Sequence, residues 1–364
     1  MLKLATAILF SATLAFGQRP VTTDQLVAMV RSSIKMKHED KKLAAYLKGF
    51  KLTQRLGDRT IEELLAEGAG PKTTDALREM RDTSKDLPEA VKPGPKPAPV
   101  VIPPPPPEEQ KKVFEFLKEY AANYAKSLPN FLCKQVTRRY EDKSGTEFWG
   151  LRDTIIASLS FNEGKEDYKV QLINNHAVMD TPFEKLGGFQ TRGEFGSWMR
   201  DIFDPESGAT FDWDRWATLG GKRMHVYRYY INAAASKMTA AYDTESITIS
   251  YKGYIYADRD TNLIMRVTLQ AVDLPATFGM KQIDSVIDYR TVDISGRQSL
   301  LPVRSETKVR DRFRLTKNEV EFRMYRKFGA DETIKFDLPD DPLSAGDFKE
   351  MPATPAPPPA PKKQ

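Results

Sequence analysis

A long two-stranded hairpin within residues 244–269 constrains the fold of this chain more than any other stretch. In its first strand, apolar or small side chains alternate with polar ones, as in a strand with one buried and one wet face. Residues 258–262 (DRDTN) supply a turn, and the alternation resumes on a returning strand, with Lys252 and Arg266 on the wet face. Such a sheet must cover its apolar face with a helix, a second sheet or a bound apolar molecule, and the sequence leaves these three open. The apolar face comprises Ile247, Ile249, Tyr251, Gly253, Ile255 and Ala257, then Leu263, Met265, Val267 and Leu269.

The first 17 residues predict export. Residues 1–17 carry one early lysine, Lys3, then an apolar run over residues 4–16 that ends in small residues, as in a cleaved signal peptide. The run is shorter than the ~20 residues that cross a bilayer, and no later stretch is long and apolar enough to do so. We therefore expect the mature protein to be periplasmic or secreted, without a transmembrane segment.

Composition indicates a folded chain rather than a disordered one. The 364 residues are 40% hydrophobic and 29% charged, which suffices for about two domains of ~100–200 residues. A net charge of +5 over this length is too small to argue for a nucleic-acid partner by itself. Cys133 is the only cysteine, so no intramolecular disulfide forms, and its strand-like surroundings predict a buried, inert thiol.

Proline-rich segments divide the chain. Residues 20–90 show capping residues followed by apolar stripes at helical spacing, which predicts a small all-helical domain. Residues 91–108 include PGPKPAPVVIPPPPP, a composition typical of a semi-rigid polyproline spacer. Residues 337–364 are again proline-rich and predict a disordered tail.

Residues 109–336 predict one α+β domain. It begins with a helix that carries an apolar stripe, and about ten strand-like segments follow. Between strands, Trp198, Met199 and Phe203 recur at helical spacing after two glycines, as in a short amphipathic helix. The expected fold is a curved antiparallel sheet, a half-barrel, wrapped around a helix. The stripe of the first helix comprises Val113, Leu117, Tyr120, Ala121, Tyr124 and Leu128.

The helical domain carries one recognisable motif. Residues 64–77, LLAEGAGPKTTDAL, resemble the helix-hairpin-helix pattern of DNA-binding proteins, in which a Gly-apolar-Gly turn presents N–H groups to a phosphate. Gly68, Gly70 and Lys72 occupy the corresponding positions, and they are the phosphate-binding residues of this alternative. The simpler interpretation is a glycine turn that joins two helices. Because an exported protein meets little nucleic acid, a nucleic-acid partner is not expected.

The sequence gives little support for catalysis. His38, His176 and His225 lie far apart, no HExxH is present, and no G-x-S-x-G elbow appears. We therefore expect no metal site, no cofactor and no enzymatic activity. A hydrolase whose catalytic residues are dispersed along the chain is kept as an alternative.

The central hairpin also carries a family resemblance. Residues 253–266, GYIYADRDTNLIMR, and residues 300–304, LLPVR, resemble segments of the periplasmic lipoprotein-carrier family, LolA and LolB, and of the related sensor domain of RseB. The resemblance implies a half-barrel that holds acyl chains in an apolar concavity. The helical domain and the proline spacer are departures from that family.

These observations predict an exported, non-enzymatic envelope protein that binds an apolar or lipid-like ligand, or a lipidated protein, through its curved sheet. A protein partner in the envelope is the second expectation, since the helical domain of a scaffold protein would engage another macromolecule. Whether the apolar concavity is open or filled is left undecided by the sequence. The residues predicted to contact the ligand are Ile255, Ala257, Met265, Trp198, Met199 and Phe203.

Overall fold

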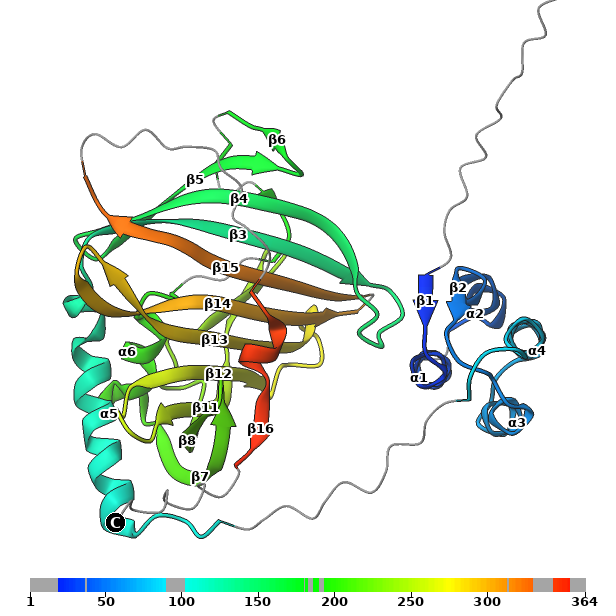
Figure 1. The fold of residues 1–364 in the computed structure, drawn as a ribbon, viewed down its shortest axis with the longest axis horizontal. Helices are drawn as coiled ribbons and strands as arrows, with labels where there is room; N and C mark the ends of the chain where they lie inside the picture. The colour runs from blue at the N-terminus through cyan, green and yellow to red at the C-terminus, as the bar shows by residue number, and fades with distance from the viewer. Residues whose placement is uncertain are drawn as a thin grey trace, which may run out of the picture. The chain divides into compact units, whose positions relative to one another are not determined.

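The computed structural model describes residues 19–36, 38–89, 102–179, 181–182, 186–189, 193–312, 314–329 and 343–353 (Figure 1). The signal peptide predicted at residues 1–17 lies outside these, as do residues 91–101 of the linker and residues 337–342 and 354–364 of the tail. The chain forms two compact units, residues 1–96 with 144–146, and residues 97–143 with 147–364.

The first unit consists mainly of short helices. Thr22 caps the first one: its hydroxyl accepts from the N–H of Gln25, whose side chain accepts from the N–H of Thr22 in return. Two three-residue strands pair in parallel beside the helices, a feature absent from the expected all-helical module. The elements are β1 (Arg19–Val21), α1 (Thr23–Lys35), α2 (Asp40–Leu47), β2 (Phe50–Leu52), α3 (Asp58–Ala66) and α4 (Pro71–Thr83).

The second unit is a sheet with its two α-helices on one side. Its large sheet has 12 strands in the order β16-β7-β8-β11-β12-β13-β14-β15-β3-β4-β5-β6, and neighbouring strands are antiparallel throughout. The sheet is curved and does not close, which confirms the expected α+β class (Figure 1). Its helical elements are α5 (Pro107–Ser127), α6 (Ser197–Phe203) and the 3-10 turns η2 (Pro205–Ser207) and η3 (Ala345–Phe348). Its strands are β3 (Phe131–Asp142), β4 (Gly150–Asn162), β5 (Lys165–Ile173), β6 (His176–Ala177), β7 (Thr210–Leu219), β8 (Lys222–Ile231), β9 (Thr239–Tyr242), β10 (Glu245–Thr248), β11 (Ser250–Asp258), β12 (Ile264–Val272), β13 (Met280–Ile294), β14 (Arg297–Asp311), β15 (Leu315–Lys327) and β16 (Glu350–Pro352).

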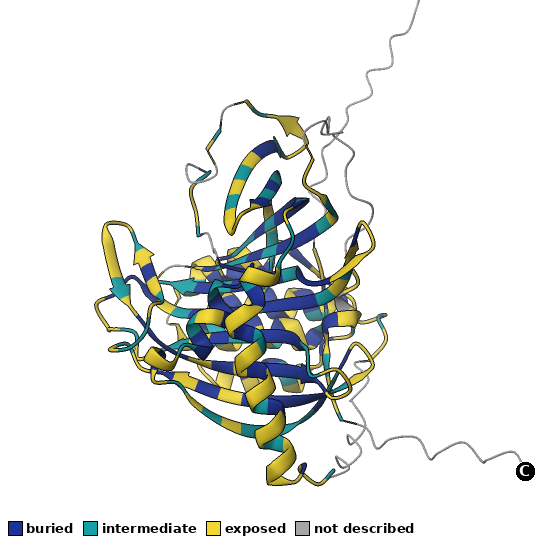
Figure 2. Ribbon diagram, turned by 90° about the vertical axis from the view of Figure 1, so that its left-hand side faces the viewer, coloured by how far each residue is buried: buried dark blue, intermediate teal, exposed yellow. Residues whose placement is uncertain are grey.

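Helices α5 and α6 cover the apolar face of the sheet, which we call the inner face. Leu117 of α5 and Met199 of α6 are fully buried in one hydrophobic cluster with strands β7, β8, β11, β12 and β13. Figure 2 looks toward α5, whose outward side is exposed in front of buried strands. On β11, Ile255 points into this cluster, whereas Lys252 and Tyr254 are exposed on the opposite, outer face. The sequence did not decide what covers the apolar face of the sheet, and in the structure this cover is made largely of helices.

The central hairpin differs from its prediction in two ways. The predicted first strand is interrupted at Ile249: residues 245–248 form β10, which pairs with β9, and β11 begins at Ser250. Thus the hairpin proper is β11 and β12, with a bulge after Tyr256. Arg266, expected on a wet face, is only 6% exposed, because the chain around Phe348 covers it.

The tail also departs from the expected disorder. Within residues 337–364, the stretch 345–352 forms η3 and β16, and Glu350, Met351 and Pro352 pair with the end of β7. Glu350 accepts hydrogen bonds from Arg215 and from the hydroxyl of Tyr256. The residues that bind this stretch lie far from it in sequence, so the composition of the tail does not predict that it packs on β7.

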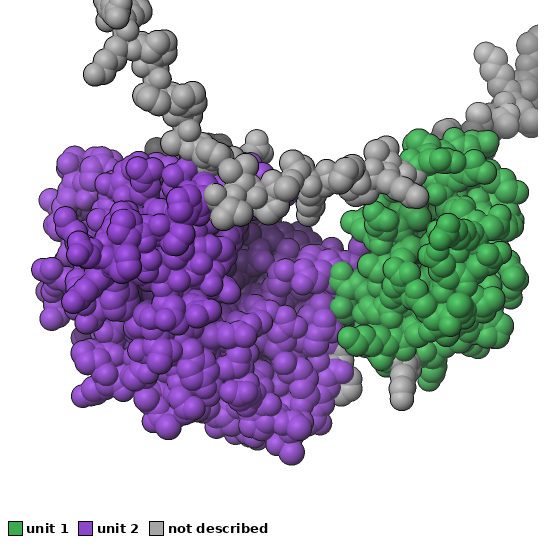
Figure 3. Space-filling model, turned by 90° about the horizontal axis from the view of Figure 1, so that it is seen from below, with its two compact units in different colours: residues 1–96, 144–146 green, residues 97–143, 147–364 purple. Residues whose placement is uncertain are grey.

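Figure 3 shows the two units in space-filling form. In neither unit do the described residues include a helix that is both long and apolar enough to cross a membrane.

Candidate functional site

The structure brings all six predicted ligand-contact residues into one cluster. Ile255, Ala257 and Met265 come from the central hairpin, and they join Trp198, Met199 and Phe203 of α6. None of the six exposes more than 8% of its surface. A ligand can reach them only where α5 or α6 leaves room. Their role as ligand contacts remains a prediction.

A glycine sets the close approach of α6 to α5. Gly196 caps α6 with φ +119°, a backbone conformation that favours glycine. A Cβ atom on Gly196 would lie 2.9 Å from the Cβ of Ala125 and 3.0 Å from Cδ1 of Tyr124. The glycine punctuation before this helix therefore lets its first turn pack directly on α5.

A cavity of about 340 Å³ opens beside α5, at the end of β13 and β14. The hydroxyl of Tyr124 donates to the carbonyl of Leu300 (2.9 Å), and Arg297 Nη2 donates to the carbonyl of Ser127 (2.8 Å). Both bonds join α5 to β14 at the wall of the cavity. The lining residues are Tyr120, Tyr124, Ser127, Leu128, Leu263, Thr291, Arg297, Gln298, Ser299 and Leu300.

The cavity continues the hydrophobic cluster of the predicted ligand contacts. Tyr124 and Leu300 belong to that cluster, while Tyr120, Leu128 and Leu263 pack against it. Burial raises the pKa of Tyr120 to about 12, so its phenol is uncharged at neutral pH. Arg297, an exposed residue, is the one formally charged side chain in the lining. The cavity thus has an aromatic and aliphatic wall on one part of its lining, uncharged polar residues on another, and a single cation.

The sequence revealed only part of this cavity. Tyr120, Tyr124 and Leu128 belong to the predicted helix stripe. Leu300 and Arg297 were missed as site residues, because only the β13–β14 hairpin, turning at Ser295 and Gly296, brings them to α5.

The alternative phosphate site of the first unit contains a carboxylate. Gly68 has φ +108° and Gly70 caps α4, as a glycine turn requires. The N–H groups of Lys72 and Thr73 both donate to Asp40, each at 2.9 Å. Desolvation raises the pKa of Asp40, but hydrogen bonds from Thr73 and Lys72 outweigh it, so the pKa lies below its ordinary value. An ionised Asp40 therefore holds the donors that a phosphate needs, which counts against this alternative.

The histidines and the cysteine do not assemble a catalytic group. His38 and His176 are exposed, whereas His225 is buried, and its ring centroid lies 4.3 Å from that of Trp216. Desolvation, helped by Arg259, lowers the pKa of His225 to about 4, which leaves it neutral. Burial raises the pKa of the Cys133 thiol, so it is not a nucleophile at neutral pH. In the described part of the chain, no three His, Cys, Asp or Glu side chains lie close enough to hold a metal ion.

Comparison with known proteins gives similarity to solved structures only. No protein-family model matches the chain. No curated protein matches it either.

Three of the similar solved structures are bacterial proteins. A DUF1329 family protein from Desulfovibrio piger is 9% identical with a TM-score of 0.33, over 66% of this chain and 98% of that one. A putative outer membrane lipoprotein-sorting protein domain from Vibrio parahaemolyticus is 8% identical with a TM-score of 0.30, over 62% and 95%. A LolA superfamily protein from Nitrosomonas europaea is 11% identical with a TM-score of 0.26, over 62% and 94%. At these identities and TM-scores, the similarities carry neither a superfamily nor a function to this chain.

Proposed function

We propose that this chain is an exported envelope protein, without enzymatic activity, that binds an apolar or lipid-like ligand or the lipid group of a lipidated partner. The observation that supports this function is the cavity beside α5, whose walls continue the hydrophobic cluster of the inner face. Cleavage of residues 1–17 would deliver the protein to the periplasm or the exterior.

The size and lining of the cavity suit the end of an amphiphile. Its volume of about 340 Å³ falls at the small end of the ~300–1,000 Å³ of small-molecule sites. Leu263 and Leu300 offer apolar contact, and the guanidinium of Arg297 can pair with a carboxylate or phosphate head. A longer hydrocarbon chain of the ligand would extend toward Met199 and Phe203 only if α6 shifted, because both residues are buried under α5.

Filling the cavity should weaken binding without unfolding the protein. Leu263 is only partly buried, so Leu263→Trp places the larger ring in free volume rather than in packed core. We expect the Kd for a fluorescent fatty acid to rise at least 10-fold, while the melting temperature stays within a few degrees. Fluorescence titration and thermal unfolding measure the two quantities.

Leu274→Trp is the matched control. Leu274 is also partly buried against the same hydrophobic cluster but does not line the cavity. The Leu274→Trp variant should therefore bind the fluorescent fatty acid with the same Kd as the wild type. Equal affinity of Leu263→Trp and wild type, or no binding to the wild type, would exclude the cavity as the ligand site.

A further inference from the structure

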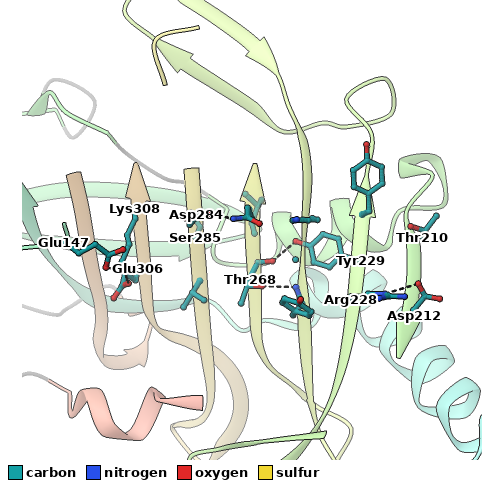
Figure 4. Close-up of a pocket in the computed structure, with 17 residues that line it drawn as sticks. Glu147, Thr210, Asp212, Arg228, Tyr229, Thr268, Asp284, Ser285, Glu306 and Lys308 are labelled. Atoms are coloured by element: carbon teal, nitrogen blue, oxygen red, sulfur yellow. Dashed lines mark hydrogen bonds and ion pairs between the residues drawn. The ribbon is translucent and has the colours of Figure 1, made fainter. Parts of the chain in front are cut away.

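Residues 344–352, which we call the C-terminal segment, lie on the outer face of the sheet and comprise η3 and β16. A hollow of about 640 Å³ crosses strands β7, β8, β11, β12, β13 and β14 on the same face (Figure 4). Tyr254 lines this hollow, and the guanidinium of Arg215, which binds the segment, lies 4.7 Å from the centroid of its ring. The lining of the hollow carries four carboxylates and three cations, so its charge selects no ligand. The contacts of the segment are more selective.

An aromatic side chain anchors the first half of the segment. Phe348 is only 6% exposed, and the guanidinium carbons of Arg290 and Arg304 lie 5.0 and 5.5 Å from the centroid of its ring. Cations over an aromatic face are attracted to it. Arg266 Nη2 donates to the carbonyl of Phe348 (2.5 Å), and Arg290 Nη2 donates to the carbonyl of Asp347 (3.1 Å). Arginines of the sheet therefore contact both the ring and the backbone of the segment.

A carboxylate two residues later is the second anchor. Arg215 Nη2 donates to Glu350 Oε1, and the hydroxyl of Tyr256 donates to Glu350 Oε2, each at 2.8 Å. Tyr256 is buried, so its hydroxyl is held in place for this bond. The side chains beside this anchor, Lys349 and Met351, are exposed. The sheet therefore recognises an aromatic residue followed by any residue and then a carboxylate.

The charge of the sheet at this site also favours a carboxylate. Four arginines contact the segment, and three of them form ion pairs with three carboxylates of the sheet. The fourth, Arg290, has no ion-pair partner among the residues that the structure describes. Without the segment, the site thus carries one cation more than carboxylates, which suits an acidic ligand. The three pairs are Arg215–Asp214, Arg266–Asp288 and Arg304–Glu306.

The segment uses only part of the sheet edge that it occupies. β16 pairs with Ala217–Leu219, three of the ten residues of β7. Its last residue, Pro352, has no N–H group and cannot continue the ladder. Within the described chain, residues 210–216 of β7 have no strand partner on this side. Because an unpaired edge can accept another strand, a peptide without this proline could pair further along β7.

We propose that this site binds an extended segment of a partner protein, in which an aromatic residue is followed two positions later by a carboxylate, and that the C-terminal segment occupies the site until the partner displaces it. The aromatic ring lies between Arg290 and Arg304, the carboxylate binds Arg215 and Tyr256, and the following residues pair with β7. Because the C-terminal segment belongs to the same chain, it competes at an effective concentration of ~mM. The site is separate from the cavity beside α5, so either proposal can fail without the other.

Fluorescence anisotropy with the full chain tests this proposal. The probe is a labelled peptide of residues 344–356 with Pro352→Thr and Pro355→Val, which lets it pair along the free edge of β7. The full-chain double variant Phe348→Ala, Glu350→Ala, which we call the released variant, lacks both anchors of its own segment. We expect it to bind the probe with a Kd at least 10-fold lower than that of the wild type, because the internal competitor is weakened. The probe without the two proline substitutions should bind more weakly, since it cannot extend the ladder.

Matched controls separate release of the segment from other effects. Lys349→Ala, Met351→Ala changes two exposed side chains of the same segment and should bind the probe as the wild type does. A second peptide, the probe with alanine in place of Phe348 and Glu350, should bind the released variant at least 10-fold more weakly than the probe. Glu350→Ala alone keeps Phe348 in place and should also lower the Kd for the probe, which guards against unfolding in the released variant.

Variants of the sheet place the peptide at this site. Added to the released variant, Arg215→Ala should raise the Kd for the probe at least 10-fold. Arg228→Ala, at an exposed arginine of β8 that does not contact the segment, should leave it unchanged. A released variant that binds the probe no more tightly than the wild type, or that binds both peptides equally, would overturn the proposal. So would equal Kd values for Arg215→Ala and Arg228→Ala.

Discussion

Gly253→Ala should destabilise the second unit by at least about 3 kcal/mol, the upper end of the usual cost of overpacking. At about 2–4 °C per kcal/mol for a unit of this size, the melting temperature should fall by roughly 6 °C or more. The reason is local: a Cβ atom on Gly253 would overlap the carbonyl oxygen of Thr268 and meet Cε1 of Tyr229 at 2.8 Å. Backbone on one side and a hydrogen-bonded ring on the other leave neither neighbour free to move.

Gly329→Ala is the matched control for this change. Gly329 belongs to the same unit, and a Cβ atom there would meet no atom within 4 Å. We expect its melting temperature to equal that of the wild type or to rise slightly, because alanine narrows the unfolded ensemble. If the Gly253→Ala and Gly329→Ala variants have the same melting temperature, β11 is less constrained at Gly253 than its contacts indicate.

Asp288→Ala should cost about 3–5 kcal/mol, because it leaves a buried guanidinium without its carboxylate. Arg266 Nε donates to Asp288 Oδ1 (2.6 Å), and the two residues are 6% and 0% exposed. Arg266 Nη2 also donates to the carbonyl of Phe348 (2.5 Å), so the charge lies between the sheet and η3. Thermal unfolding should show a fall of roughly 6 °C or more.

Two further variants test whether the loss of stability in Asp288→Ala comes from the burial of the unpaired charge. Asp212→Ala removes one partner of Arg228, but both side chains are more than 60% exposed, so we expect a cost of about 1 kcal/mol or less. The double variant Arg266→Met, Asp288→Leu removes both buried charges and should recover much of the lost stability. A melting temperature for Asp288→Ala within about 2 °C of wild type would show that the pair is solvated in solution.

Local patterns predicted the elements of this chain well. Alternation predicted β11 and β12, and apolar stripes predicted α5 and α6. Capping residues with apolar stripes predicted helices within residues 20–90, where α1, α2, α3 and α4 form. These signals are local, since side-chain period depends on the backbone and a cap depends on the next few residues.

Features that depend on distant partners could not be predicted. Arg266 lies where alternation predicts a wet face, yet Phe348, 82 residues later, covers it. The strand Glu350–Pro352 exists because β7 offers a free edge at Ala217–Leu219, and no pattern in a proline-rich tail signals that. The cavity beside α5 likewise needs Leu300 beside Tyr124, 176 residues apart. Sequence reasoning therefore identified the wall of the site formed by α5 and missed the opposite one.

The most direct test of the proposed function is to identify what the protein retains. Wild type, Leu263→Trp and Leu274→Trp would each be purified from an envelope fraction, extracted with organic solvent and examined by mass spectrometry for lipids per mole of protein. The cavity beside α5 predicts a lipid near equimolar amount in wild type and Leu274→Trp, and at least 10-fold less in Leu263→Trp. A wild type that holds no more lipid than Leu263→Trp would contradict the assignment of this protein as a carrier of apolar ligands.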